Sequence, residues 1–149
     1  EALNDDRLDI IATDHAPHTK EEKENTYFKA PSGLPLVQHV LLQMLEFVNE
    51  GRISLERMVE KMSHAPAECF QLANRGYLRE GFAADLVLVD PASSTVVNQD
   101  QILYKCGWSP FEGKSFASSI NATYVNGVMV FDGEKVLDLT PGQRLEFDR

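Results

Sequence analysis

The stretch that decides the fold is LDIIATDHAPHT, residues 8–19. Its first half, residues 8–13, is a short apolar run rich in β-branched residues and flanked by charge, which predicts a buried strand of a parallel sheet. Asp14, His15 and His18 follow at once. Because active sites collect at the carboxyl ends of strands in barrels and open α/β sheets, this position is a candidate functional site.

The polar cluster permits two interpretations. A carboxylate can bind a metal or accept a proton, and an imidazole can bind a metal or hold an anion. An aspartate after a strand is equally typical of a helix cap or a turn, and loop histidines are often merely exposed. Catalytic zinc generally has three or more protein ligands. His39 and His64 fall on predicted helices, where a structural role is favoured, so we expect most ligands of any metal at Asp14 to come from elsewhere.

Composition narrows the class of protein. A chain of 149 residues that is 43% apolar can form one ordinary domain with a core. The net charge of -9 and the lack of a Lys/Arg cluster argue against a nucleic-acid partner. Neither a membrane-span pattern nor a signal-peptide pattern is present, so a cytoplasmic protein without a membrane partner is expected. Cys69 and Cys106 are accordingly expected to be reduced.

The pattern along the chain changes from helical to strand-like. Apolar residues recur at helical spacing over residues 36–49, Ser54 suits the N-cap of a second helix, and a third helix is expected from Ser63, with Pro66 in its first turn. We place a boundary near Asn74.

Beyond that boundary the sequence predicts mostly antiparallel strands. A short strand and turn are expected over residues 76–81, a strand over residues 84–90, and a hairpin at Asn126-Gly127. Trp108 and Phe111 are expected to be packing residues that seat their own segment and do not contact a substrate.

Five stretches together resemble one enzyme family. In chain order they are IIATDHAPHT, APSGLPLVQH, GYLREGFAADLVLVD, YKCGWSPFEGK and ATYVNGVMVFDG. In this order they are similar to the C-terminal third of dihydroorotases, which belong to the amidohydrolase superfamily. TDHAPH and GWSPFEG resemble dihydroorotases and their immediate relatives, whereas the pattern ending in ADLVLVD is shared across many amidohydrolases.

The resemblance implies an α/β fold in two parts. Residues 1–74 would form the C-terminal end of a (β/α)8 barrel, with its last strand and helices, and residues 75–149 would form part of a small β-sandwich. It also implies that the chain is a piece of a longer enzyme. The piece would be held either by the remainder of the parent chain or by self-association, as a homo-oligomer, through its exposed strands.

The activity implied by the resemblance is the zinc-dependent, reversible cyclisation of N-carbamoyl-L-aspartate to dihydroorotate in pyrimidine biosynthesis. At matching positions, Asp14 is implied as the general base and acid and as a ligand of one or two Zn²⁺ ions, and His18 as a partner of the substrate carboxylate. Ser32 and Gly33 match residues that contact the substrate ring, although many bacterial members have Phe where this chain has Ser32.

The remaining metal ligands of the family, including a His-x-His on the first barrel strand, are absent from this sequence. We therefore expect the chain alone neither to bind zinc tightly nor to turn over dihydroorotate. Three alternatives stay open: an allantoinase or hydantoinase, a non-catalytic homologue that is a structural partner of aspartate transcarbamoylase, and a β-rich module without catalysis.

Overall fold

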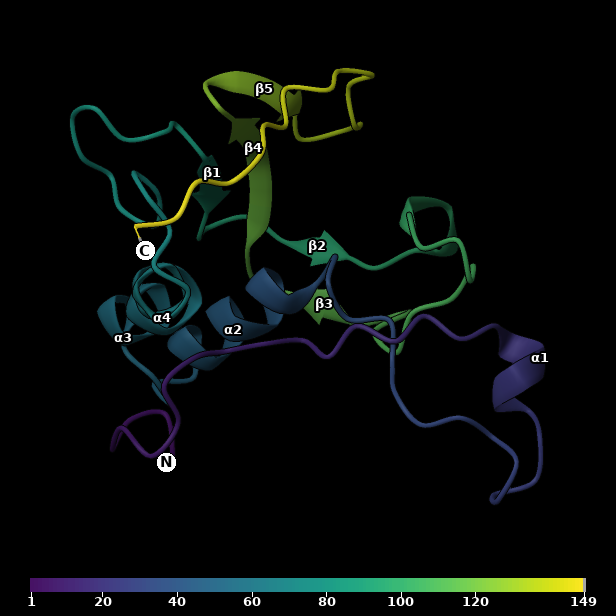
Figure 1. Ribbon diagram of the computed structural model, residues 1–149. Helices are drawn as coiled ribbons and strands as arrows, with labels where there is room; N and C mark the ends of the chain where they lie inside the picture. Colours follow the sequence, from purple (N-terminus) through teal and green to yellow (C-terminus); the bar gives the residue numbers. More distant parts are fainter. Residues whose placement is uncertain (149) are drawn as a thin grey trace.

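The α-helices occupy the first half of the chain and the strands the second (Figure 1). The computed structural model describes residues 1–148. In chain order the elements are α1 (Lys20–Lys23), α2 (Val40–Asn49), α3 (Leu55–Val59), the π-helical η1 (Glu60–His64), α4 (Ala65–Cys69), β1 (Leu86–Asp90), β2 (Thr95–Val96), the 3₁₀ helix η2 (Gln99–Gln101), β3 (Ser115–Phe116), β4 (Ser119–Val125) and β5 (Val128–Phe131). This mixed content confirms the coarse α/β class.

The apolar run at residues 8–13 is extended, but it is not a strand. Its backbone contact with the helices is the Ile11 N–H, which donates to the Lys61 carbonyl at 2.9 Å. A strand needs a hydrogen-bonded neighbour, and within residues 1–148 no segment forms a ladder with this run. Within residues 1–148 the predicted strand therefore does not form, and Leu8 is left 54% exposed.

Helix α2 confirms the predicted helix, although it begins at Val40, after the predicted start at residue 36. Its buried face carries Leu42, Met44 and Leu45. Met44 and Leu45 form a core with two residues that follow the helix, Ile53 and Met58. Burial of this apolar face stabilises a helix that would be marginal on its own at this length.

A single helical run follows, where the sequence predicts two helices. Ser54 caps it as predicted, since its Oγ accepts the Arg57 N–H at 3.1 Å. The run then passes through η1, in which the Ala65 N–H bonds to the Glu60 carbonyl, and continues as α4. Pro66 has no N–H to donate to the preceding turn, and the wider π turn directly before it keeps the run continuous. The predicted break at Ser63 is therefore wrong.

The main sheet is antiparallel, with the order β1-β4-β5. β4 and β5 form the predicted hairpin, and Asn126 and Gly127 have φ values of 49° and 78°. Both central residues of a type I′ turn need positive φ, which explains this residue pair. β1 confirms the predicted strand, whereas residues 76–81 form bends and turns without strand pairing. β2 and β3 form a separate two-stranded sheet.

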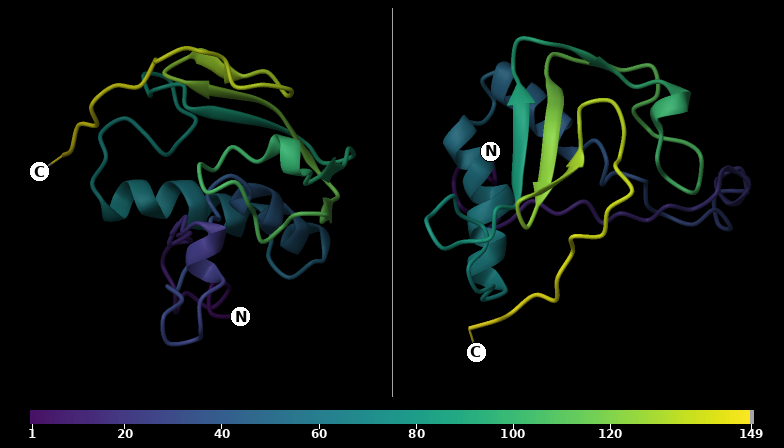
Figure 2. Two further views of the ribbon diagram at one scale, coloured as in Figure 1. Left: turned by 90° about the vertical axis from the view of Figure 1, so that its right-hand side faces the viewer. Right: turned by 90° about the horizontal axis from the view of Figure 1, so that it is seen from above.

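The main sheet lies over the layer of helices, as the two views in Figure 2 show. Two apolar contacts join the helices to the strand-bearing half of the chain. Val89 of β1 packs against the helical core, and Leu42 of α2 forms a second core with the fully buried Val97 and Phe116. The helical half and the strand half of the described chain therefore share apolar cores.

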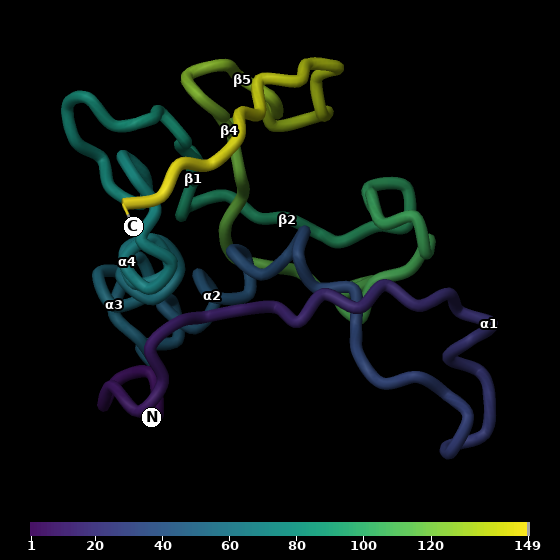
Figure 3. Tube along the Cα trace, viewed as in Figure 1, coloured from purple at the N-terminus to yellow at the C-terminus, as the bar shows by residue number. Residues whose placement is uncertain are grey.

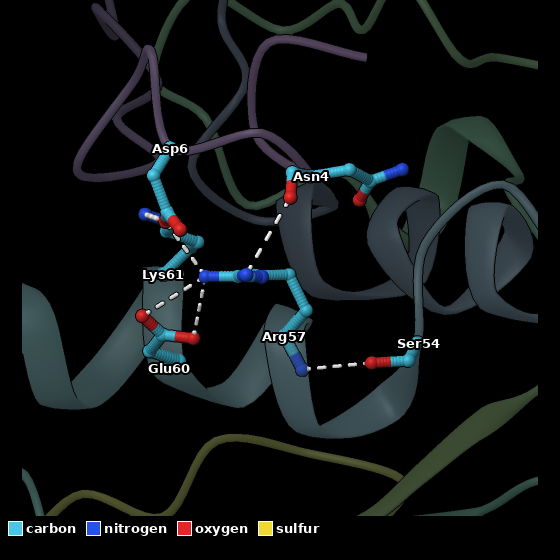
Figure 4. Close-up of polar contacts among 6 residues, drawn as sticks. All are labelled: Asn4, Asp6, Ser54, Arg57, Glu60 and Lys61. Atoms are coloured by element: carbon cyan, nitrogen blue, oxygen red, sulfur yellow. Dashed lines mark hydrogen bonds and ion pairs between the residues drawn. The ribbon is translucent and has the colours of Figure 1, made fainter.

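A charged cluster ties the N-terminal turn to the helical run (Figure 4). Lys61 is buried, and its Nζ donates to Asp6 Oδ1 at 2.8 Å, while Arg57 Nη1 donates to the same oxygen at 2.7 Å. Arg57 also bonds to Glu60 at 3.0 Å. The hydrogen bond from Lys61, with the nearby charge of Arg57, holds the pKa of Asp6 below its usual value, although partial desolvation opposes this shift.

None of the helices in the described part of the chain is long and apolar enough to span a membrane.

Candidate functional site

The loop that follows the extended run presents Asp14 to solvent. Asp14 has a φ of 45°, a left-handed conformation that aspartate tolerates better than most residues. Its carboxylate has no hydrogen-bond or ion-pair partner within residues 1–148. A carboxylate held in this way is free to accept a proton or to bind a cation.

The ring of His15 makes hydrogen bonds within the protein. Its Nδ1 accepts the Leu36 N–H at 3.1 Å and lies 3.4 Å from the Val37 nitrogen. Because these partners are donors, the neutral ring carries its proton on Nε2. The ring also lies 5.2 Å from that of Tyr104. The sequence left open whether His15 has a functional or a structural role, and these contacts favour the structural role.

His18 is held through its backbone and is half-exposed at its ring. Its N–H donates to the Ala16 carbonyl at 3.0 Å, and its own carbonyl accepts Trp108 Nε1–H at 2.8 Å. The ring Nδ1 lies 3.5 Å from Glu22 Oε2. The Thr19 backbone N–H, and secondarily His18, hold the pKa of Glu22 below its usual value. The contact with Glu22 is the one polar contact of the His18 ring within residues 1–148.

The loop at Ser32 and Gly33 lies directly against the histidine loop. The Ala16 N–H donates to the Leu34 carbonyl at 3.1 Å, and a Cβ added at Gly33 would stand 2.4 Å from Ala16 Cβ. Ser32 is exposed beside this contact. The structure thus brings together the two stretches in which the sequence places site residues, while the roles of those residues remain predictions.

Figure 3 shows that residues between these two loops form an arm that carries α1 and projects from the body. Lys23 fastens the base of this arm, because its Nζ donates to the Pro31 carbonyl at 2.7 Å and to the Gly33 carbonyl at 3.1 Å. α1 itself begins with a capping box, in which Thr19 and Glu22 satisfy each other's backbone N–H groups. The arm is therefore tied at both of the loops that it connects.

The other two histidines have structural contacts, as predicted. His39 is buried, and its Nδ1 lies 3.4 Å from both Tyr104 Oη and Ser109 Oγ. Burial lowers the pKa of His39, which favours the neutral ring. His64 stacks on Tyr77 with ring centroids 4.1 Å apart.

The described residues contain no group of three or more His, Cys, Asp or Glu side chains that could hold a metal ion. Asp14 fits one position of a metal site because its oxygens are unpaired and exposed. The loop therefore offers one unpaired carboxylate, which can accept a proton or bind a cation, and one half-exposed imidazole, that of His18.

Comparison with known proteins identifies the family of this chain. The model of the amidohydrolase family matches residues 1–130. The chain belongs to the amidohydrolase family. This amidohydrolase chain is 40% identical over 136 residues to a dihydroorotase of Halobacterium salinarum, covering 91% of this chain and 32% of that protein. It is 41% identical over 133 residues to a dihydroorotase of Clostridioides difficile, covering 89% of this chain and 31% of that protein.

Among solved structures, the amidohydrolase chain is similar to L-hydantoinase (dihydropyrimidinase) from Arthrobacter aurescens. The TM-score is 0.83 at 34% identity, over 92% of this chain and 32% of that chain. The chain spans about a third of the length of the curated relatives it matches.

Sequence reasoning missed three residues that support the site of this amidohydrolase chain: Lys23, Tyr104 and the Trp108 indole N–H. Their partners lie in other segments, and two of the three contacts end on backbone carbonyls. A backbone acceptor leaves no trace in the sequence pattern, so no spacing rule indicates these contacts. The one signal for Trp108 is that a partly buried indole N–H usually finds a hydrogen-bond partner.

Proposed function

We propose that this chain is the C-terminal part of a zinc-dependent dihydroorotase, a cytoplasmic enzyme that interconverts N-carbamoyl-L-aspartate and dihydroorotate in pyrimidine biosynthesis. The observation that carries the proposal is the identity of 40% and 41% to two dihydroorotases over about nine tenths of the chain. The unpaired Asp14 carboxylate and the half-exposed His18 ring, both in the loop that follows residues 8–13, support it.

The proposal places this chain within the fold of a longer enzyme. Residues 1–74 are the last strand and helices of a (β/α)8 barrel, and residues 75–149 are strands of a composite β-sandwich. The extended apolar run at residues 8–13 supports the first assignment, because it has the composition of a buried strand and has no ladder partner among residues 1–148. The remainder of the parent chain would supply the neighbouring strands and most metal ligands.

Asp14 is the proposed proton carrier and the ligand that this chain gives to a centre of one or two Zn²⁺ ions. When bound, zinc acts as a Lewis acid and can lower the pKa of water to about 7. The Asp14 carboxylate accepts the proton that the attacking water loses and delivers it to the ring nitrogen as the amide C–N bond breaks. General acid–base help of this kind contributes roughly a hundred- to ten-thousand-fold to the rate.

His18, Ser32 and Gly33 are the proposed substrate contacts. The half-exposed imidazole of His18 can hold the substrate carboxylate. Gly33 has no side chain and a φ of 96°, so its backbone can approach a flat ring closely. Ser32 is exposed next to it and offers a hydroxyl.

The test uses the complete enzyme, in which this chain is joined to the N-terminal part that the proposal assigns to it. Asp14→Asn should lower kcat for dihydroorotate hydrolysis about a hundredfold or more, because the asparagine side chain cannot accept the proton of the attacking water and deliver it to the ring nitrogen. Asp9→Asn is the matched control, since Asp9 is exposed and its carboxylate has no partner in the described chain. Full activity of Asp14→Asn would contradict the proposal.

A hydantoinase is the second candidate, and the likeness to the Arthrobacter aurescens L-hydantoinase favours it. The two candidates differ in the charge of the substrate, because dihydroorotate carries a carboxylate that dihydrouracil lacks. His18→Asn should raise KM for dihydroorotate about tenfold and leave KM for dihydrouracil unchanged. An enzyme that turns over hydantoin or dihydrouracil, but not dihydroorotate, would be a hydantoinase.

A further inference from the structure

Trp108 connects two distant parts of the chain at the candidate site. Its indole Nε1–H donates to the carbonyl of His18 at 2.8 Å, across 90 positions of sequence. This is a well-formed hydrogen bond by distance. The indole is half-buried, so the bond is partly shielded from competing water.

The segment that carries Trp108 is hydrogen-bonded to the residues directly before α2. Tyr104 is buried, and its Oη accepts the Gln38 N–H at 2.8 Å. The turn is closed by the Gly107 N–H, which donates to the Tyr104 carbonyl at 2.9 Å. Directly after the indole, the buried Ser109 accepts the Phe111 N–H at 3.2 Å and lies against His39. Trp108 therefore extends from an anchored base.

The bond from Trp108 fixes the main chain of His18 and leaves its ring free. On one side the His18 N–H is bonded to Ala16. On the other side its carbonyl is held by the indole, and the next residue, Thr19, caps α1. The ring itself has one polar contact, with Glu22 at 3.5 Å. The location of the imidazole is thus set by its backbone, and the indole is the contact that ties this backbone to the strand half.

We propose that Trp108 is a positioning residue for substrate recognition: its indole N–H holds His18 where the imidazole meets the carboxylate of the substrate. This inference rests on the proposed function, which assigns the carboxylate to His18. It gives the GWSPF segment, residues 107–111, a role in specificity for anionic rings. It adds this role to the predicted one, in which Trp108 seats its own segment and does not contact the substrate.

The decisive variant keeps the shape of the indole and removes its N–H. Replacement of Trp108 by benzothienylalanine does this in the complete enzyme, and Trp108→Phe is a second variant made by ordinary mutagenesis. Both should raise KM for dihydroorotate about two- to tenfold, the range expected for one lost neutral hydrogen bond, and change kcat less than about twofold. KM for dihydrouracil, which has the same ring without the carboxylate, should stay unchanged.

Two further measurements separate positioning from general destabilisation. In a His18→Asn background, Trp108→Phe should change KM by less than about 1.5-fold, because the side chain it positions is gone. The amide hydrogens of residues 15, 16, 18 and 19 should exchange about two- to tenfold faster in the benzothienylalanine variant. Lys105→Met is the matched control, since Lys105 lies in the same turn, is exposed and has no polar partner in the described chain.

Three results would overturn the inference: equal KM changes for dihydroorotate and dihydrouracil, additive effects of the two substitutions, or unchanged exchange at residues 15–19. Failure of the proposed function would give a different result: the unsubstituted enzyme would not turn over dihydroorotate at all.

Discussion

Gly33 and Ala16 set how closely the two loops of the candidate site approach each other. Gly33 has a φ of 96°, and a Cβ at this position would stand 2.4 Å from Ala16 Cβ. Gly33→Ala should therefore lower the free energy of unfolding by about 1–3 kcal/mol, through backbone strain and the clash together. Urea unfolding would measure the change.

The control for this prediction is Gly142→Ala. Gly142 has no heavy atom within 4 Å of an added Cβ, and its φ lies outside the left-handed region. Its substitution should change the free energy of unfolding by less than about 0.5 kcal/mol. Equal effects of the two substitutions would mean that the contact between the loops is not what constrains Gly33.

Single residues were predictable where residue type alone decides the role. Asp85 and Asp90 flank an apolar strand, where an aspartate typically bonds to a nearby backbone N–H, and they accept the N–H groups of Asn126 and Ala92 at 2.8 Å. Lys23 could not be predicted in the same way. A lysine that bonds to two carbonyls of a distant loop looks in sequence like any surface lysine.

At the scale of elements, Asp6 joins the N-terminal turn to the helical run through Lys61 and Arg57. The pKa of Asp6 is lowered in the folded chain, above all by the hydrogen bond from Lys61. Stability from this contact is therefore fully present above the unfolded pKa of Asp, about 4, and is lost as the pH falls through the lower folded pKa.

Asp6→Asn should accordingly destabilise the chain at neutral pH and flatten its loss of stability below about pH 4. Asparagine suits the test because it tolerates the φ of 57° that Asp6 adopts. Urea unfolding at a series of pH values would measure both effects, with Asp9→Asn as a control that alters an exposed carboxylate without a partner. A pH profile of Asp6→Asn that parallels the original one would refute the assignment.

The helices and strands that could be predicted are those that their own local sequence determines. α2 follows from its own apolar period, and the β4–β5 hairpin follows from Asn126-Gly127. The strand over residues 8–13 does not form within residues 1–148, because parallel pairing depends on neighbouring strands that a local pattern cannot supply. The break at Ser63 also failed, because Pro66 suggested a new helix, whereas the chain absorbs it with a π turn.

At the scale of the whole molecule, β1 is an edge strand of the main sheet. Val87 and Leu88 on this strand are 47% and 50% exposed. An exposed apolar edge is a template for pairing with another chain. We therefore predict that the isolated chain self-associates in a concentration-dependent manner, as measured by sedimentation velocity, and that Leu88→Lys weakens this association.

Leu139→Lys is the matched control, because Leu139 is 52% exposed but lies outside the strands. A monomeric isolated chain, or equal effects of the two lysine substitutions, would rule out pairing through β1.

The sequence could not reveal how the two halves of the chain meet. The boundary near Asn74 was drawn from a change of pattern and stays a prediction. Leu42 packs against Val97 and Phe116, which lie far beyond that boundary. Contacts of this kind depend on the path of the chain in space, and no local period encodes them.

The hydrogen bond between Trp108 and His18 has an evolutionary consequence. The indole holds a backbone carbonyl, a group that every amino acid possesses. A mutation at position 18 can therefore replace the imidazole without releasing the loop from its anchor. Under the role proposed for His18, recognition and anchorage would be carried by different atoms of one residue, so a single side-chain change could alter substrate choice without loosening the loop.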